Sequence, residues 1–257
     1  MITNTFTFLD GIGRKREQQL WQSGITDWNK FLDAERIFDI STKSKIYYDY
    51  ELKNAKKALL EDDSSYFARK FPSTDTWRLF DHFRDEAVYL DIEATGVGND
   101  GYITLVGLYD GNDTKTMVKD INLDVKRLAQ IVSQHKLMIT FNGSSFDLPM
   151  LAKKYPVLSA VFSQIPHIDL RHLCAEVGLV GGLKKIEREM NIKRNNFWVE
   201  RLHGGDAAQL WRLWSGSKDE YYLKLLIEYN EEDIINLKQI MVHCYNEMKS
   251  LLVQKFK

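Results

Sequence analysis

Three short acidic segments place carboxylates where they could act together on one substrate. They are Asp91-Ile92-Glu93, Asp147 at the end of Phe141-Asn142-Gly143-Ser144-Ser145-Phe146-Asp147, and Asp233 at the end of Tyr229-Asn230-Glu231-Glu232-Asp233. Four carboxylates that meet in a dry pocket repel one another, so such a cluster persists only if it is protonated or holds cations. The three segments therefore predict a divalent-metal site.

Asp91 and Glu93 lie two residues apart in a segment with strand-like composition. Because alternate residues of a strand face the same side, the two carboxylates project together while Ile92 points to the opposite, apolar face. Mg²⁺ and Mn²⁺ prefer oxygen ligands, and a pair of these ions can stabilise both the attacking and the leaving oxygen of a phosphodiester displacement. A lone D-x-E pair is more often a solvated strand face, but the apolar segment Val88-Tyr89-Leu90 before it indicates a buried strand.

Each of the other acidic segments has a plain structural alternative. Asp147 lies at the expected start of a helix, where its carboxylate could cap exposed N–H groups. Tyr229 and Asp233 are four residues apart on one helical face and could form a surface pair. Asn142 precedes a glycine and is either a turn residue or a contact to the backbone of a bound strand. Asp169 is expected to cap a helix and is not included among the metal ligands.

The elements that would position these residues indicate an α/β domain preceded by a small helical module. Residues 1 to about 75 read as short helices at 15–22, 27–34 and 47–60, and the turn-prone segment 71–75 is the expected boundary. Domains are therefore expected at 1–75 and 76–257. The expected strands are 87–93, 102–109, 116–119 and 137–141, with a turn at 98–101 and helices at 125–134, 145–154 and 222–249.

Composition disfavours several classes of protein. The 257-residue chain is 44% hydrophobic with a net charge of -1, so any contact with nucleic acid must come from local patches. Cys174 and Cys244 lie outside any C-x-x-C pattern, and the histidines show no zinc-protease spacing, which disfavours a disulfide framework and a zinc enzyme. The chain has no signal-like start and no apolar run of ~18 residues, so we expect a cytoplasmic protein without a membrane partner.

In this order and spacing, the three acidic segments resemble the motifs of the DEDD superfamily of 3′→5′ exonucleases, which have a ribonuclease H-like fold. The resemblance covers about residues 85–250 and implies a mixed sheet flanked by helices. Tyr229 is similar to the tyrosine that marks the DEDDy branch, and Glu228 stands where the histidine branch has its histidine. The segments Tyr102-Ile103-Thr104-Leu105-Val106-Gly107 and Gly182-Leu183-Lys184-Lys185-Ile186 resemble the YprB-like subgroup.

The resemblance implies roles for five residues. Asp91, Glu93, Asp147 and Asp233 would bind two Mg²⁺ or Mn²⁺ ions, and Tyr229 would orient the attacking water through its hydroxyl. Because a free tyrosine titrates near pH ~10, positioning suits it better than proton transfer. The implied activity is a metal-dependent 3′→5′ exonuclease acting on single-stranded DNA or DNA 3′ ends. The alternatives are RNA as the substrate and a catalytically inactive nucleic-acid-binding scaffold.

The segment Leu9-Asp10-Gly11-Ile12-Gly13-Arg14 resembles a helix-hairpin-helix motif, which binds nucleic-acid backbones without reading sequence. Its glycines would let backbone N–H groups approach a phosphate, and the basic triplet Arg14-Lys15-Arg16 adds positive charge. A second basic segment, which contains Lys184, Lys185, Arg188, Lys193 and Arg194, either lines the path of a single strand or forms a solvated helix face. The expected nucleic-acid contacts are Gly11, Gly13, Arg14, Lys15, Asn142, Lys184 and Lys185.

Overall fold

A five-stranded mixed sheet with strand order β3-β2-β1-β4-β5 forms the centre of the computed structural model, which describes residues 1–96, 101–202 and 204–255. The turn predicted at 98–101 falls largely outside these residues. β1 pairs antiparallel with β2 and parallel with β4, which is parallel to β5, so the C-terminal ends of β1, β4 and β5 share one edge. The strands are β1 (Ala87–Ala94), β2 (Ile103–Tyr109), β3 (Thr114–Val118), β4 (Leu137–Thr140) and β5 (His167–Asp169). The predicted α/β architecture is confirmed.

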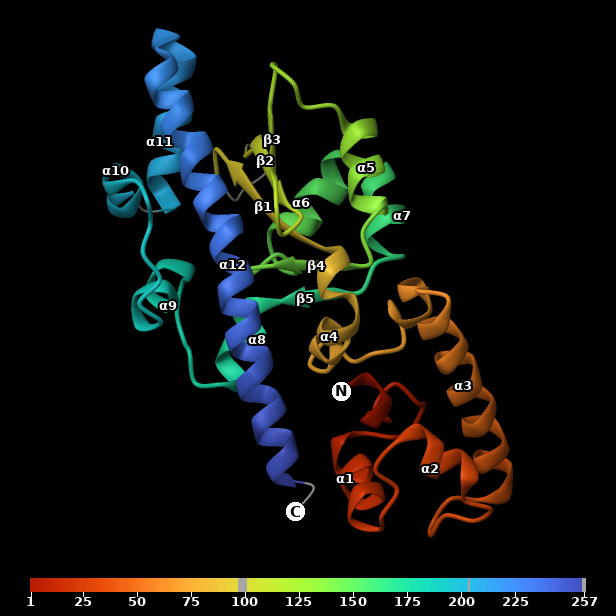
Figure 1. Cartoon of the computed structure of the whole chain (residues 1–257). Coiled ribbons are helices and arrows are strands. Elements are labelled where there is room, and N and C mark those ends of the chain that lie inside the picture. Colours follow the sequence, from red (N-terminus) through yellow and green to blue (C-terminus); the bar gives the residue numbers. More distant parts are fainter. Residues whose placement is uncertain (97–100, 203, 256–257) are drawn as a thin grey trace.

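Helices cover both faces of the sheet (Figure 1). α5 (Val125–Ser133), α6 (Asp147–Lys154) and α7 (Pro156–Phe162) lie on one face, and the long helix α12 (Glu220–Lys255) crosses the other. Between β5 and α12 the chain forms four further helices: α8 (Leu170–Glu176), α9 (Leu183–Glu189), α10 (Phe197–Arg201) and α11 (Gly204–Ser217). Sequence analysis expected a helix after Asp169, where α8 begins, and gave no bounds for any of the four. Every helix in the described ranges is too short or too polar to cross a lipid bilayer.

The alternation of residues along β1 separates the core from the polar side of the sheet. Val88, Leu90 and Ile92 are buried in a cluster with side chains of α5, α6 and α7. Asp91 and Glu93 face the opposite side, where α12 lies, as the D-x-E spacing predicts. Apolar packing on one face of β1 therefore fixes where its two carboxylates point.

α12 packs on the face of the sheet that carries Asp91 and Glu93. It contains no glycine or proline over its 36 residues, which permits an uninterrupted helix. Of the predicted apolar face, Leu226, Ile234, Leu237 and Met241 are buried. Packing of this face against the sheet brings the part of α12 that contains Asp233 next to β1.

The N-terminal residues form the three predicted helices, α1 (Arg14–Gln22), α2 (Trp28–Asp33) and α3 (Thr42–Leu60). Asp27 caps α2 and Ser41 caps α3 through hydrogen bonds to backbone N–H groups of the first turn. Short turns complete this part of the chain: η1 (Ile2–Asn4), η2 (Ser64–Phe67), η3 (Thr76–Leu79), α4 (Phe80–Phe83) and η4 (Arg84–Glu86).

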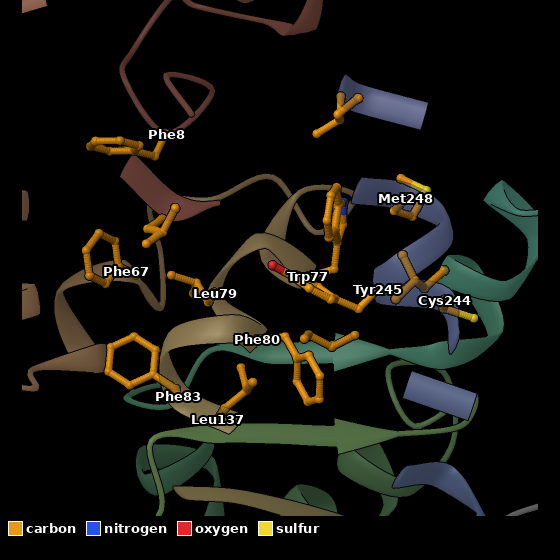
Figure 2. Close-up of a cluster of buried hydrophobic side chains, with 14 of the residues drawn as sticks. Phe8, Phe67, Trp77, Leu79, Phe80, Phe83, Leu137, Cys244, Tyr245 and Met248 are labelled. Atoms are coloured by element: carbon orange, nitrogen blue, oxygen red, sulfur yellow. The ribbon is translucent and has the colours of Figure 1, made fainter. Parts of the chain in front are cut away.

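One hydrophobic cluster runs from the N-terminal helices to the end of α12. Figure 2 shows Phe8 and Phe67 on one side of this cluster and Tyr245 and Met248 of α12 on the other, with Trp77 between them. A buried ion-pair network adds to the apolar contacts: the Arg78 guanidinium pairs with Glu17 of α1 and with Asp75, and all three side chains are at most 2% exposed. The N-terminal helices thus share one continuous core with the sheet and α12, through the side chains of Trp77, Leu79 and Phe80.

Candidate metal centre

Asp91, Glu93 and Asp233 form a compact acidic cluster between β1 and α12. One carboxylate oxygen from each residue lies within 4.8 Å of those of the other two. Glu93 and Asp233 are buried, and Asp91 is half-buried. The structure therefore brings together three of the four predicted metal ligands, although more than a hundred residues of sequence separate Asp233 from the other two.

Asp147 reaches the same strand from α6, which follows β4, the other neighbour of β1. Its Oδ1 accepts a hydrogen bond from the backbone N–H of Ile92 at 2.9 Å, and the residue is 2% exposed. It is the first residue of α6, whose N-cap residue is Phe146. The carboxylate of Asp147 thus points at β1, between Asp91 and Glu93. Asp147 is not the N-cap residue of α6, so the alternative capping role does not apply to it.

Burial raises the pKa of all four carboxyl groups, and repulsion within the cluster adds to this effect at Asp91 and Glu93. Burial raises the pKa of Asp147 to about 7 and that of Asp233 to about 6. Burial, followed by the charge of Asp147, raises the pKa of Asp91 well above its ordinary value, and burial and the charge of Asp233 do the same to the pKa of Glu93. Oxygen donors that are costly to ionise together fit divalent cations, which supply the compensating charge.

Asn230 of α12 holds Asp91 in place, and a glycine makes room for it. Its Nδ2 donates a hydrogen bond to Asp91 Oδ2 at 2.8 Å, and the residue is completely buried. Gly107 of β2 pairs with Asp91 across the sheet, and a Cβ at this position would lie only 1.8 Å from Asn230 Oδ1. Sequence analysis missed both roles. The available signal was a glycine inside an otherwise apolar strand, which often marks a close approach.

Gly107→Ala is expected to displace Asn230 and thereby to disturb Asp91. Because the added methyl overlaps a buried side chain, we expect destabilisation of about 1–3 kcal/mol and about tenfold weaker Mn²⁺ binding, since the carboxylate loses its hydrogen-bonded support. Thermal unfolding and titration calorimetry with Mn²⁺ measure the two effects. Gly216→Ala, at an exposed helical glycine with open space around it, is the matched control. Wild-type stability and affinity in Gly107→Ala would contradict this account.

Tyr229 lies one turn before Asp233 on α12 and is 6% exposed. The Nζ of Lys184 lies 4.9 Å from its ring centroid, and the guanidinium carbon of Arg194 lies 5.5 Å from it. Burial, followed by the charges of Asp233 and Glu93, raises the pKa of Tyr229 far above its ordinary value. The hydroxyl therefore stays protonated at neutral pH, so it can orient a neighbouring group but cannot act as a base.

Arg194, which sequence analysis treated only as part of a basic segment, belongs to this centre. Its Nε and Nη2 donate to the carboxylate of Glu187 at 3.0 and 2.8 Å, and Nη2 also pairs with Asp233. Asn236 of α12 donates to the same Glu187 carboxylate at 2.8 Å. This buried network ties α9 and the segment that follows it to the helix that carries Asp233.

The two predicted basic contacts on α9 have internal partners. Lys184 Nζ donates to the backbone carbonyl of Val199 at 3.0 Å and to that of Leu202. Lys185 Nζ donates to the carbonyl of Val180 at 2.9 Å. Burial lowers the pKa of Lys184. Lys184 thus lies beside Tyr229 while connecting α9 to the end of α10.

Asn142 takes a left-handed backbone conformation, with φ of 67°. Its Oδ1 accepts a hydrogen bond from Arg171 Nη1 at 2.7 Å. The N–H groups of Asn142 and Ser144 donate to the carboxylate of Asp169 at 2.7 and 3.0 Å, and Asp169 also caps α8, as predicted. Asp169 therefore fixes the loop that leads from β4 to Asp147.

The hairpin-like segment precedes α1. Gly11 has a φ of +76°, which favours glycine, and Gly13 is the N-cap residue of α1. Arg14 pairs with Asp75 and Glu176, and its neighbour Arg16 pairs with Asp39. Lys15 is exposed. Two of the three consecutive basic residues are therefore engaged with acidic side chains of the same chain.

The fold and the site together define a class: an α/β protein in which the central strand of a mixed sheet and a C-terminal helix carry a buried carboxylate centre. Residues 88–245 match the model of the RNase H superfamily, and because the match spans more than half of the chain, the protein belongs to this superfamily and has its fold. No curated protein matches the chain.

Among solved structures, the chain is similar to the family B DNA polymerase from the hyperthermophilic archaeon Pyrobaculum calidifontis. The sequence identity is 14% and the TM-score is 0.46. The match covers 61% of this chain and 24% of the polymerase chain.

Proposed function

We propose that the protein is a metal-dependent 3′→5′ exonuclease of the DEDDy type that hydrolyses phosphodiester bonds of single-stranded DNA. The observation that carries this proposal is the meeting of Asp91, Glu93 and Asp233 within 4.8 Å, with the carboxylate of Asp147, from α6, bound to the backbone of β1 at Ile92. Membership of the RNase H superfamily supports a nuclease. The YprB-like subgroup is proposed from the sequence motifs alone.

The four carboxylates of this site would hold two Mg²⁺ or Mn²⁺ ions. Bound divalent ions polarise a phosphoryl oxygen and lower the pKa of water. The charges of the site are consistent with two ions. Glu187 and Arg194 neutralise each other, and the four negative charges of Asp91, Glu93, Asp147 and Asp233 then match the four positive charges of two divalent ions. The chain's own contribution is to fix these oxygens: Asn230 holds Asp91, and Ile92 N–H holds Asp147.

Tyr229→Phe is expected to lower kcat about tenfold to a hundredfold, because the hydroxyl that orients the attacking water is lost while the ring remains. KM and Mn²⁺ affinity should stay close to wild type, since no carboxylate is removed. Steady-state kinetics on a single-stranded oligonucleotide and calorimetry with Mn²⁺ measure these quantities. Tyr221→Phe, at an exposed tyrosine of the same helix, is the control. An unchanged kcat in Tyr229→Phe would remove this residue from the mechanism.

Residues 1–75 are proposed to be a nucleic-acid-binding module and residues 76–257 the exonuclease domain. The loop that contains Gly11 and Gly13, with exposed Lys15 at the start of α1, supports a contact to the phosphate backbone. We assign Arg14 a smaller contribution to phosphate binding, because Asp75 and Glu176 already pair with it.

Asn142, Lys184 and Lys185 are kept as proposed contacts to the bound strand. Lys184 has the strongest support of the three, because it lies beside Tyr229.

Oligonucleotides labelled at the 3′ or at the 5′ end, incubated with the protein and Mn²⁺, test the proposed function. We expect mononucleotides to be released from the 3′ end and chelation to stop the reaction. Matched DNA and RNA substrates separate deoxyribonuclease from ribonuclease activity, because the sequence contains no recognisable contact to a 2′-hydroxyl. Binding without hydrolysis in the presence of Mn²⁺ would support the inactive scaffold instead.

A further inference from the structure

Arg194 has a buried donor group that the rest of the described chain leaves unused. Its side chain is only 2% exposed, yet Nη1 has no acceptor among the described residues. A buried donor without a partner destabilises the fold, and native proteins contain few of them. The unused donor therefore points to an acceptor that a ligand supplies.

The planar shape of the guanidinium fixes the direction in which this donor points. Nε and Nη2 form the edge that engages Glu187, and the second N–H of Nη2 engages Asp233. That second N–H belongs to the other edge of the group, which Nη2 shares with Nη1. One N–H of Nη1 is consequently parallel to the bond to Asp233 and points toward the side on which the acidic cluster lies.

Besides Asp233, groups that are not proposed metal ligands hold the guanidinium in this position. Glu187 is 3% exposed and is itself held by Asn236, so loss of Arg194 would leave a buried carboxylate unpaired. The ring of Tyr229 also lies beside the guanidinium, with its centroid 5.5 Å from the guanidinium carbon. Lys184, the other cation at this ring, donates to backbone carbonyls of α10 and of the residue after it.

We propose that Arg194 is a catalytic residue that binds a non-bridging oxygen of the attacked phosphate through Nη1. This rests on the proposed function, which places that phosphate against the acidic cluster. In the reaction, the water oxygen forms a new bond to phosphorus and the bond from phosphorus to the 3′ oxygen of the preceding nucleotide breaks. The attacking water releases a proton to solvent and the leaving 3′ oxygen takes one up from solvent, so the products are a 3′ hydroxyl and a nucleoside 5′-monophosphate. Arg194 stabilises the negative charge on the non-bridging oxygen during this displacement.

The test compares binding of deoxythymidine 5′-monophosphate with binding of thymidine, by calorimetry at saturating Mn²⁺. The variant is Glu187→Gln with Arg194→Gln, which removes the donor together with the Glu187 carboxylate that pairs with it, while saturating Mn²⁺ compensates the charge of Asp233. We expect its affinity for the monophosphate to fall about tenfold or more, since a hydrogen bond between charged groups is lost, and its affinity for thymidine to stay unchanged. Arg188→Gln, at an exposed arginine of α9, should bind both compounds like the wild type.

Wild-type affinity for the monophosphate in the double variant would overturn the assignment of Arg194. An equal loss for thymidine or for Mn²⁺ would also overturn it, because it would show that Arg194 only supports the site. Should the double variant fail to fold, Arg194→Lys keeps the charge and is expected to show the same selective loss. A wild-type protein that degrades labelled oligonucleotides but binds the monophosphate no better than thymidine would contradict only this inference, whereas one that neither binds Mn²⁺ nor degrades them would contradict the proposed function.

Discussion

Asp91→Asn is expected to lower the rate of 3′-end hydrolysis at least about a thousandfold, equivalent to ~4 kcal/mol of lost transition-state stabilisation. The amide keeps the shape of the side chain and an oxygen that can accept the hydrogen bond from Asn230. It loses the negative charge that the proposed metal site needs. The effect should therefore fall on catalysis and cation binding and leave the packing intact.

The same substitution is expected to raise the melting temperature of the metal-free protein. Burial, with the charges of Asp147, Glu93 and Asp233, raises the pKa of Asp91, so its ionised form destabilises the fold. Removal of that charge should stabilise the protein by about 1–2 kcal/mol, or roughly 2–6 °C for a chain of this size. A residue that is costly for stability but required for activity is typical of a functional site.

Oligonucleotide degradation and thermal unfolding in chelator measure the two halves of this prediction. Asp110→Asn is the matched control, because hydrogen bonds from the backbone N–H groups of Asp113 and Asn112 lower the pKa of Asp110. Loss of the Asp110 charge should lower the melting temperature slightly and leave the rate of hydrolysis unchanged. Retained hydrolysis in Asp91→Asn, or a lower melting temperature, would contradict the assignment of this carboxylate.

The stability of the metal-free protein should depend on pH through the same cluster. Burial raises the pKa of Asp147 to about 7 in the folded protein, while the unfolded value is about 3.9. Between these values the folded state binds more protons than the unfolded state, so this group's contribution to stability falls as the pH rises. We expect Asp147→Asn to become more stable than the wild type by about 2–4 kcal/mol as the pH rises from about 4 to about 7.

Melting temperatures of wild type and Asp147→Asn, measured in chelator across this range, test the prediction. The comparison is made between the two proteins because burial lowers the pKa of His167 to about 4, which acts on stability in the opposite direction and cancels in the difference. Saturating Mg²⁺ at neutral pH should stabilise the wild type more than the variant, because cations replace the missing protons. A difference that does not widen with pH, or that Mg²⁺ leaves unchanged, would contradict the account.

The sequence predicted the parts of the site that follow from local periodicity. The two-residue spacing of Asp91 and Glu93 placed both carboxylates on one face of β1, and the apolar pattern of α12 predicted the helix that carries Tyr229 and Asp233. β5 was missed because a strand of three residues is too short to show alternation.

Residues whose roles depend on distant partners could not be predicted. Arg14 formed part of an apparent basic patch, but Asp75 and Glu176 neutralise it through contacts that no local spacing reveals. Arg194 was assigned to a solvated basic segment or a strand path, yet its partners Glu187 and Asp233 bury it beside the carboxylates. Such pairs depend on the tertiary fold, which the spacing of charges along the chain does not determine.

The anomalous diffraction of crystals grown with Mn²⁺ tests the central claim most directly. The account predicts anomalous peaks within coordination distance of Asp91, Glu93 and Asp233, a second peak near Asp147, and loss of these peaks in Asp91→Asn crystals. A fully occupied Mn²⁺ site elsewhere on the protein, with no anomalous density among these four carboxylates, would contradict it.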